Sequence, residues 1–96
     1  MTDTGSRDIQ ADQIYAVARH FRLQWEPAQN AHVLLYPEGM VKLNQSAGEI
    51  MKRLDGRQTL AAATTDLEAA FNASGLLEDV LGFIRGALDQ GWVRRV

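Results

Sequence analysis

The chain has 96 residues, of which 46% are hydrophobic and 23% are charged, and its formal net charge is −2. These values are ordinary for one soluble globular domain. The negative charge disfavours a nucleic-acid binder, whose surface is normally basic. The sequence contains no cysteine, which excludes disulfides, thiolate catalysis and cysteine-based zinc sites.

The N-terminal segment, residues 1–12, is polar and mixed in charge and has little to bury, so it predicts a flexible tail before a single domain at 13–96. It lacks the apolar core of a signal peptide, and no later apolar run is long enough to cross a bilayer. We therefore expect a cytoplasmic protein without a membrane partner. Directly after the tail, Ile14, Tyr15 and Val17 predict an apolar patch that packs back on the body.

Three short strands follow in the sequence. Residues 21–25, FRLQW, alternate between apolar and polar side chains, as expected of a half-buried strand. HVLLY at 32–36 and MVKL at 40–43 are the second and third strands, joined by a Pro-Glu-Gly loop. We expect Pro37 to preset the turn and Gly39 to take a left-handed conformation in a three-residue loop. The three strands predict an antiparallel meander.

The apolar period then changes from strand to helix. An apolar stripe at i, i+3, i+4 and i+7 over residues 47–54 predicts the first helix. Its N-cap is either Asn44 or Ser46, the latter in a capping box with Glu49. Gly56, after an aspartate, is expected to end this helix in a left-handed C′ conformation.

Two more helices are predicted in the C-terminal half. Thr59 caps the first of them, whose apolar side runs over residues 60–71 and which ends at the sequence NASG. The last helix covers about residues 76–90, and Gly91 closes it before a short WVRRV tail. Three strands followed by three helices indicate an α+β fold that is winged helix-turn-helix-like.

The apolar residues of the last helix span about 160° of a helical wheel, which is wider than the stripe of an ordinary surface helix. Two interpretations remain open. Both sides of this arc belong to the core, or one side faces a groove beside an open sheet edge, where exposed apolar surface marks an interaction site.

The side chains that enzymes use do not form a recognisable pattern in this sequence. His20 and His32 flank strand residues and are expected at the surface or at an edge. The acidic pairs Asp66/Glu68 and Glu78/Asp79 fall on polar helix faces, where solvation is expected. There is no glycine-rich phosphate loop, nucleophile elbow or helical histidine pair. The sequence predicts a binding module with no catalytic residue, no cofactor and no metal site.

A winged helix also raises the possibility of a DNA-binding regulator. The last helix, however, carries Glu78, Asp79 and Asp89 against Arg85, and the helix before it has acids and no base. Phosphates would be repelled by both helices, so we expect no nucleic-acid partner. A third alternative is a small homodimerisation module, in which the open strand edge pairs with its own copy.

Several stretches together resemble one known family. They are "VLLYPEG" followed by "KLN", the helix "SAGEIMKRLDG" and the closing "FIRGALDQGW". In this order and spacing they are similar to the coenzyme PQQ (pyrroloquinoline quinone) synthesis protein D family, over about residues 15–93. The opening "IYAVARH" is less like the proline- and arginine-containing start of that family.

The resemblance implies a peptide chaperone without catalytic activity. Such proteins bind the ribosomally made PQQ precursor peptide and present it to a radical SAM enzyme, which cross-links a glutamate and a tyrosine. The peptide adds as a strand beside the third strand and lies against the third helix. Carried over to this chain, the pairing strand is Met40, Val41, Lys42 and Leu43, and the helix wall is a subset of Leu76, Val80, Phe83, Ile84 and Ala87.

Each of these residues has ordinary core packing as its alternative role. Pro37, Gly39 and Gly56 are expected to matter for turns rather than for contacts. Exposed charge can steer association, so the arginines near helix ends and at the C-terminus are candidates for the enzyme's docking surface or for solvated surface. They are Arg53, Arg57, Arg94 and Arg95.

Overall fold

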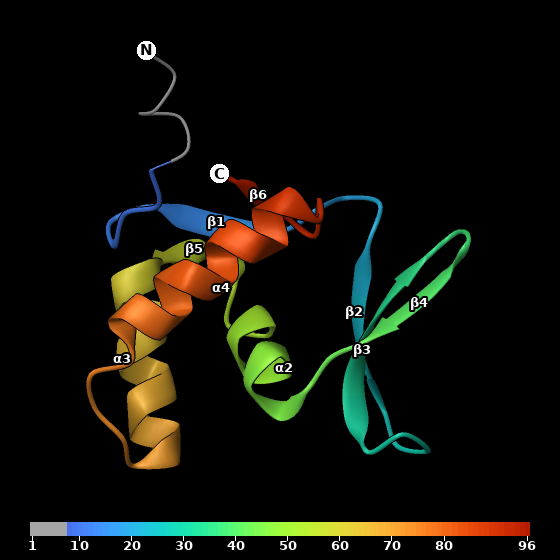
Figure 1. Cartoon of the computed structure of the whole chain (residues 1–96), viewed down its shortest axis with the longest axis horizontal. Helices are drawn as coiled ribbons and strands as arrows, with labels where there is room; N and C mark the ends of the chain where they lie inside the picture. The colour runs from blue at the N-terminus through green and yellow to red at the C-terminus, as the bar shows by residue number, and fades with distance from the viewer. Residues whose placement is uncertain (1–7) are drawn as a thin grey trace.

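The computed structural model describes residues 8–96, which form two three-stranded antiparallel sheets and three helices (Figure 1). The α+β class is confirmed, and so is a three-stranded sheet followed by three helices. The strands are β1 (Ile14–Val17), β2 (Arg22–Glu26), β3 (Ala31–Tyr36), β4 (Gly39–Lys42), β5 (Asp55–Thr59) and β6 (Val93–Arg95). The helices are α2 (Gln45–Met51), α3 (Leu60–Phe71) and α4 (Leu77–Asp89).

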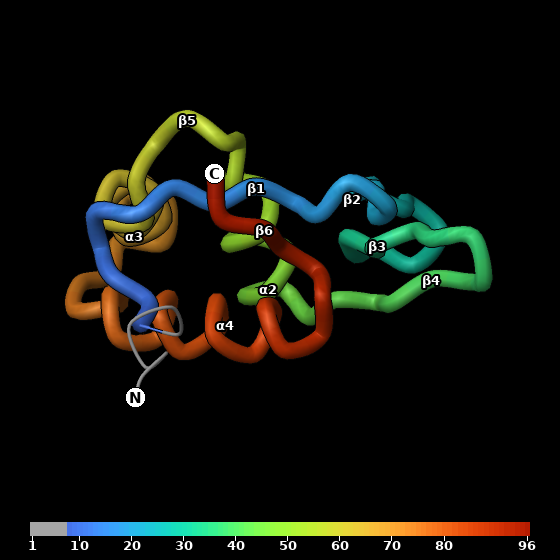
Figure 2. Tube along the Cα trace, turned by 90° about the horizontal axis from the view of Figure 1, so that it is seen from above, coloured from blue at the N-terminus to red at the C-terminus, as the bar shows by residue number. Residues whose placement is uncertain are grey.

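The predicted meander is the sheet β2-β3-β4, in which β3 is central. Its register pairs Leu34 with Leu23 on one side and with Val41 on the other. Paired residues share one face of a sheet, so these three lie together on the face that packs on the core. Figures 1 and 2 show this sheet at one end of the molecule, with the helices on one side of it.

The hairpin between β3 and β4 differs from the prediction. Tyr36 pairs with Gly39, so the loop has two residues rather than three. Gly39 has no positive φ and belongs to the strand, in contrast to the left-handed conformation expected of it. Pro37 holds φ negative at the first turn position, so this two-residue loop is not one of the primed turns that are common in hairpins.

The second sheet, β5-β1-β6, was not expected as a sheet. The apolar patch at residues 14–17 is the central strand β1, and the last residues, expected as a tail, pair with it as β6. β5 occupies residues that were expected to end a helix. Its Gly56 has φ 76°, a left-handed conformation as predicted, but at a bulge in the sheet and not at a helix C′ position.

The first helix is shorter than the apolar stripe suggests. It ends at Met51, and the N–H groups of Arg53 and Leu54 donate to carbonyls three residues back, at 3.0 and 3.1 Å. After the helix the chain continues in these tighter turns, and they place the side chain of Leu54 in the core. The i+7 position of the stripe is therefore buried without being helical.

The helix ends are fixed by polar side chains and left-handed residues. Of the two caps left open for α2, the structure has Asn44, whose side chain accepts from the N–H of Ala47 at 2.7 Å. Thr59 caps α3 as predicted, at 3.1 Å from the N–H of Ala62. Asn72 ends α3 in the left-handed conformation, and Gly91 follows α4 with φ 77°.

One core joins the two sheets and the three helices. Its centre includes Leu34, Met51, Leu60, Val80 and Ile84, all fully buried.

The boundary of the folded part lies earlier than residue 13. Ile9 is buried in the core, and the carbonyl of Ala11 accepts from the N–H of Ala61 at 2.8 Å. Of the tail expected at 1–12, residues 1–7 lie outside the described residues, whereas Ile9 and Ala11 contact the folded body.

Candidate peptide-binding site

The outer edge of β4 is open, because β4 is the last strand of its sheet. The N–H of Leu43 donates to the carbonyl of His32 at 3.0 Å, which makes these two residues a hydrogen-bonded pair. Hydrogen-bonded pairs alternate along an antiparallel ladder. The backbone groups of Val41 therefore point to β3, whereas the N–H and C=O groups of Met40 and Lys42 point outward.

A groove of about 380 Å³ begins where β4 ends. One side is formed by the chain that leaves β4, the floor by α2, and the far side by α4 and Trp92. This places an apolar hollow directly beside the open edge, between elements distant in sequence. The lining residues are Lys42, Leu43, Asn44, Ser46, Ala47, Ile50, Asp79, Phe83 and Trp92.

The four predicted strand residues divide between the two faces of the sheet. Val41 is half-buried and Leu43 is buried, both on the face that packs on the core. Met40 and Lys42 are exposed on the other face, and 49% of Met40 is accessible. Leu43 is therefore mainly a core residue in this structure, although it also lines the groove.

The predicted helix wall is mostly core. Val80, Ile84 and Ala87 are 1%, 0% and 1% exposed, so they have no surface to offer a ligand in this structure. Leu76 and Phe83 are half-buried, and of the five predicted wall residues only Phe83 lines the groove. The apolar arc of α4 is broad because fully buried residues occupy its middle and partly buried residues lie on both sides of them.

Sequence reasoning missed Asp79 and Trp92 as groove residues. Asp79 was assigned to a solvated polar face, and Trp92 to a tail. Ala47 and Ile50 were placed on an apolar stripe, which was the signal that the first helix would offer its side to another element.

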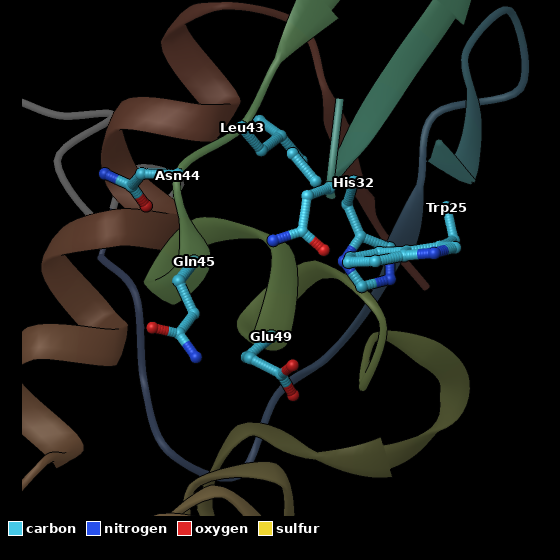
Figure 3. Close-up of a pocket in the computed structure, with 8 residues that line it drawn as sticks. Trp25, His32, Leu43, Asn44, Gln45 and Glu49 are labelled. Carbon is cyan, nitrogen blue, oxygen red and sulfur yellow. The ribbon is translucent and has the colours of Figure 1, made fainter. Parts of the chain in front are cut away.

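A second hollow, of about 380 Å³, lies on the other side of Leu43 and Asn44 (Figure 3). The indole of Trp25 and the imidazole of His32 meet edge-on there, with ring centroids 5.0 Å apart. Glu49 lines the same hollow, and its hydrogen bond from Arg53, helped by Lys52, holds the pKa of the carboxyl below its usual value despite some burial. Within residues 8–96, no three His, Asp or Glu side chains gather as metal ligands.

Two acids expected to be solvated have structural partners. Asp66 accepts from Nε of Arg53 at 2.9 Å, and Glu68 accepts from the N–H of Leu76, also at 2.9 Å. Arg53 also bonds Glu49 at 2.7 Å, so the guanidinium links α2 to α3 and is only 10% exposed. This removes Arg53 from the candidates for an enzyme docking surface. Arg57, Arg94 and Arg95 are exposed.

In the part of the chain that the structure describes, no helix has the length and apolarity needed to span a membrane.

Comparison with known proteins places this architecture in a family. The sequence profile of coenzyme PQQ synthesis protein D (PqqD) matches residues 31–93. A PqqA binding protein of Pseudomonas aeruginosa is 52% identical over 83 residues, 85% of this chain and 90% of that protein. One from Azotobacter vinelandii is 48% identical over 94 residues, 97% of each chain.

A solved structure agrees with the sequence matches. It is the solution NMR structure of the PqqD truncation of Methylobacterium extorquens PqqCD, described as a functional, stand-alone recognition element for ribosomally synthesized and post-translationally modified peptides. The two folds superpose with a TM-score of 0.77 at 25% identity, over 93% of this chain and 97% of the other. The chain belongs to the coenzyme PQQ synthesis protein D family.

Proposed function

We propose that this chain is a non-catalytic adaptor that binds the PQQ precursor peptide, PqqA, as an added strand on β4 and presents it to a radical SAM enzyme. The names of its relatives and the recognition-element fold support the first part. The family resemblance supports the second. The observation that carries the proposal is the open edge of β4 beside an apolar groove.

Strand addition explains why both features are needed. Main-chain hydrogen bonds to an open edge supply affinity for any extended peptide, and side-chain pockets supply specificity. Met40 and Lys42 direct their unpaired backbone groups outward, while Phe83 and Trp92 line the groove next to them. A peptide on this edge would cover exposed backbone and half-buried apolar surface together.

The fluorescence of Trp92, which lines the groove, can report peptide binding. The chain has two tryptophans, and only Trp92 lines the groove, whereas Trp25 lies on β2 at the opposite edge of the sheet. In a Trp25→Phe background, titration with PqqA peptide should therefore change the Trp92 emission and saturate. Amide shifts should concentrate in residues 40–47 and near residues 79, 83 and 92.

Proline substitution tests strand addition directly, because proline lacks the N–H that would donate to a carbonyl of the added strand. Met40→Pro and Lys42→Pro remove outward groups, and each should weaken binding by up to about tenfold, while the fold survives. Trp25→Pro is the matched control: the alternation places its N–H outward on the β2 edge, and binding should persist. Far-UV circular dichroism checks that each variant folds.

Two results would contradict the proposal. Normal binding by both β4 proline variants would exclude strand addition on this edge. Unchanged Trp92 emission and unchanged amide shifts at peptide concentrations far above micromolar would exclude PqqA binding by the chain alone.

A second copy of the chain could occupy the same open edge, which is the homodimer alternative. Light scattering over a concentration series measures this, since an edge-to-edge dimer dissociates on dilution. If dimerisation occurs through β4, Lys42→Pro should abolish it, and PqqA should compete with it.

A further inference from the structure

We infer that Lys42 and Asp79 read the charge pattern of the bound peptide, with an acidic residue held opposite Lys42 and a basic residue beside Asp79. This deepens the proposed function and rests on it. Both residues border the groove, one from the strand side and one from the helix side.

Lys42 is placed to contact one residue of an added strand. It is exposed, and the strand register puts its side chain on the face of the sheet opposite to Val41 and Leu43, which we call the outer face. Its backbone groups point to the open edge, so a strand added there has one residue directly across from Lys42 on that same face. Opposite charges at directly facing positions stabilise strand pairs.

Asp79 is the counterpart on the helix side. It lies exposed in the first turn of α4, a helix whose N-cap residue Leu76 makes no side-chain capping bond. The partial positive charge of a helix N-terminus favours an acid here, and this accounts for an acidic first turn. It does not account for the position of Asp79 over the groove, which its neighbour Glu78 does not line.

Neither charge has an ion-pair partner among the described residues. The ion pairs there join Glu49 to Lys52 and to Arg53, and Arg53 to Asp66. Lys42 and Asp79 are therefore available to a ligand without the loss of an internal pair.

The pleat of the added strand fixes how the two charges must be spaced. The peptide residue facing Lys42 points to the outer face, and its two neighbours, facing Val41 and Leu43, point to the groove side. A basic residue that reaches Asp79 must also point to the groove side. The basic and acidic residues of the bound segment should thus be an odd number of positions apart, with apolar residues over Phe83 and Trp92.

Charge reversal with rescue tests this. PqqA peptide and its single charge-reversal variants are titrated into Lys42→Glu and Asp79→Lys. Each protein variant should bind the wild-type peptide roughly fivefold more weakly, since one exposed charge pair contributes up to about that factor. One acid-to-lysine peptide should restore binding to Lys42→Glu, and one base-to-glutamate peptide should restore it to Asp79→Lys.

Matched controls separate local pairing from general electrostatics. Arg22→Glu changes the same charge on the same sheet face, but on β2, and Glu78→Lys changes the same helix turn outside the groove. Both should bind wild-type peptide within about twofold of the unaltered protein, as uncoupled surface charges do.

Equal weakening in the controls, or no rescue by any single peptide variant, would overturn the inference while leaving peptide binding intact. Two rescuing peptide positions an even number of residues apart would also overturn it. If the unaltered protein does not bind wild-type PqqA, the proposed function fails, and this inference fails with it.

Discussion

The imidazole of His32 lies against the backbone of Gly48, so that α2 approaches β3 with only this one side chain between them. A Cβ placed on Gly48 would be 2.8 Å from Nδ1 and 3.0 Å from Cβ of His32. Such distances are closer than packed atoms tolerate. This contact sets how near α2 approaches the sheet, and hence the position of the groove floor.

Gly48→Ala should therefore destabilise the protein by about 1–3 kcal/mol, the usual cost of overpacking. Gly86→Ala, in a helical position with nothing within 4 Å, is the matched control. It should stabilise α4 by about 0.5–1 kcal/mol, because alanine favours helix over glycine. Urea unfolding measures both, and a neutral Gly48→Ala would show that α2 can move away from β3 freely.

Neighbouring residues on α4 should separate stability from binding. Ile84→Ala opens a cavity in the core and should cost about 2–5 kcal/mol of unfolding free energy. Phe83→Ala removes a half-buried ring from the groove and should lower PqqA affinity at a smaller cost in stability. The measurements are chemical denaturation and the Trp92 titration. Equal loss of stability in both variants would argue that Phe83 is a core residue only.

Removing the N-cap of α3 should lower the stability of the protein at a position remote from the groove. Thr59→Ala loses the bond to the N–H of Ala62 and should destabilise the protein by about 1 kcal/mol. Thr59→Ser keeps the hydroxyl and should retain most of that stability. PqqA affinity should be the same for all three proteins when they are folded. A change in affinity would reveal coupling between α3 and the site.

Lowering the pH should weaken the ion pair between Glu49 and Arg53. The pKa of Glu49 lies below the ordinary value of 4.5, chiefly because of the hydrogen bond from Arg53, so its contribution to stability is present above pH 4.5 and is lost as pH falls through the lower folded pKa. We expect Glu49→Gln to be less stable than the wild type at pH 7, by under about 1 kcal/mol because the carboxylate is partly exposed. The difference between the two proteins should shrink as pH falls below 4.5 and through that folded pKa. A difference that stays constant across the acid range would exclude this linkage.

Patterns with a clear period were predictive for this chain. The β2-β3-β4 meander, the cap at Thr59, the end of α3 at the sequence NASG and the bounds of α4 follow from local sequence. The second sheet does not. β5 reads Asp-Gly-Arg-Gln-Thr, which has little intrinsic preference for a strand, and it is extended because it pairs with β1.

The general position of the site was also predictable from local sequence patterns. An open strand after a hairpin is visible in sequence, and so is an apolar arc on a helix. Which part of the arc faces outward is decided by packing, and packing buried Val80, Ile84 and Ala87 while leaving Phe83 at the groove. Asp79 and Trp92 reach that groove only through the tertiary arrangement of α4 and β6.

The pairing of β1 with β6 brings the beginning and the end of the folded chain into one sheet, where the N–H of Val96 donates to the carbonyl of Ile14 at 2.8 Å. Both views place this sheet away from the hairpin that carries β4 (Figures 1 and 2). A protein tethered at Val96 would thus leave the strand edge free and still hold a bound peptide at high effective concentration nearby. A fusion at Val96 would therefore not block the open edge of β4.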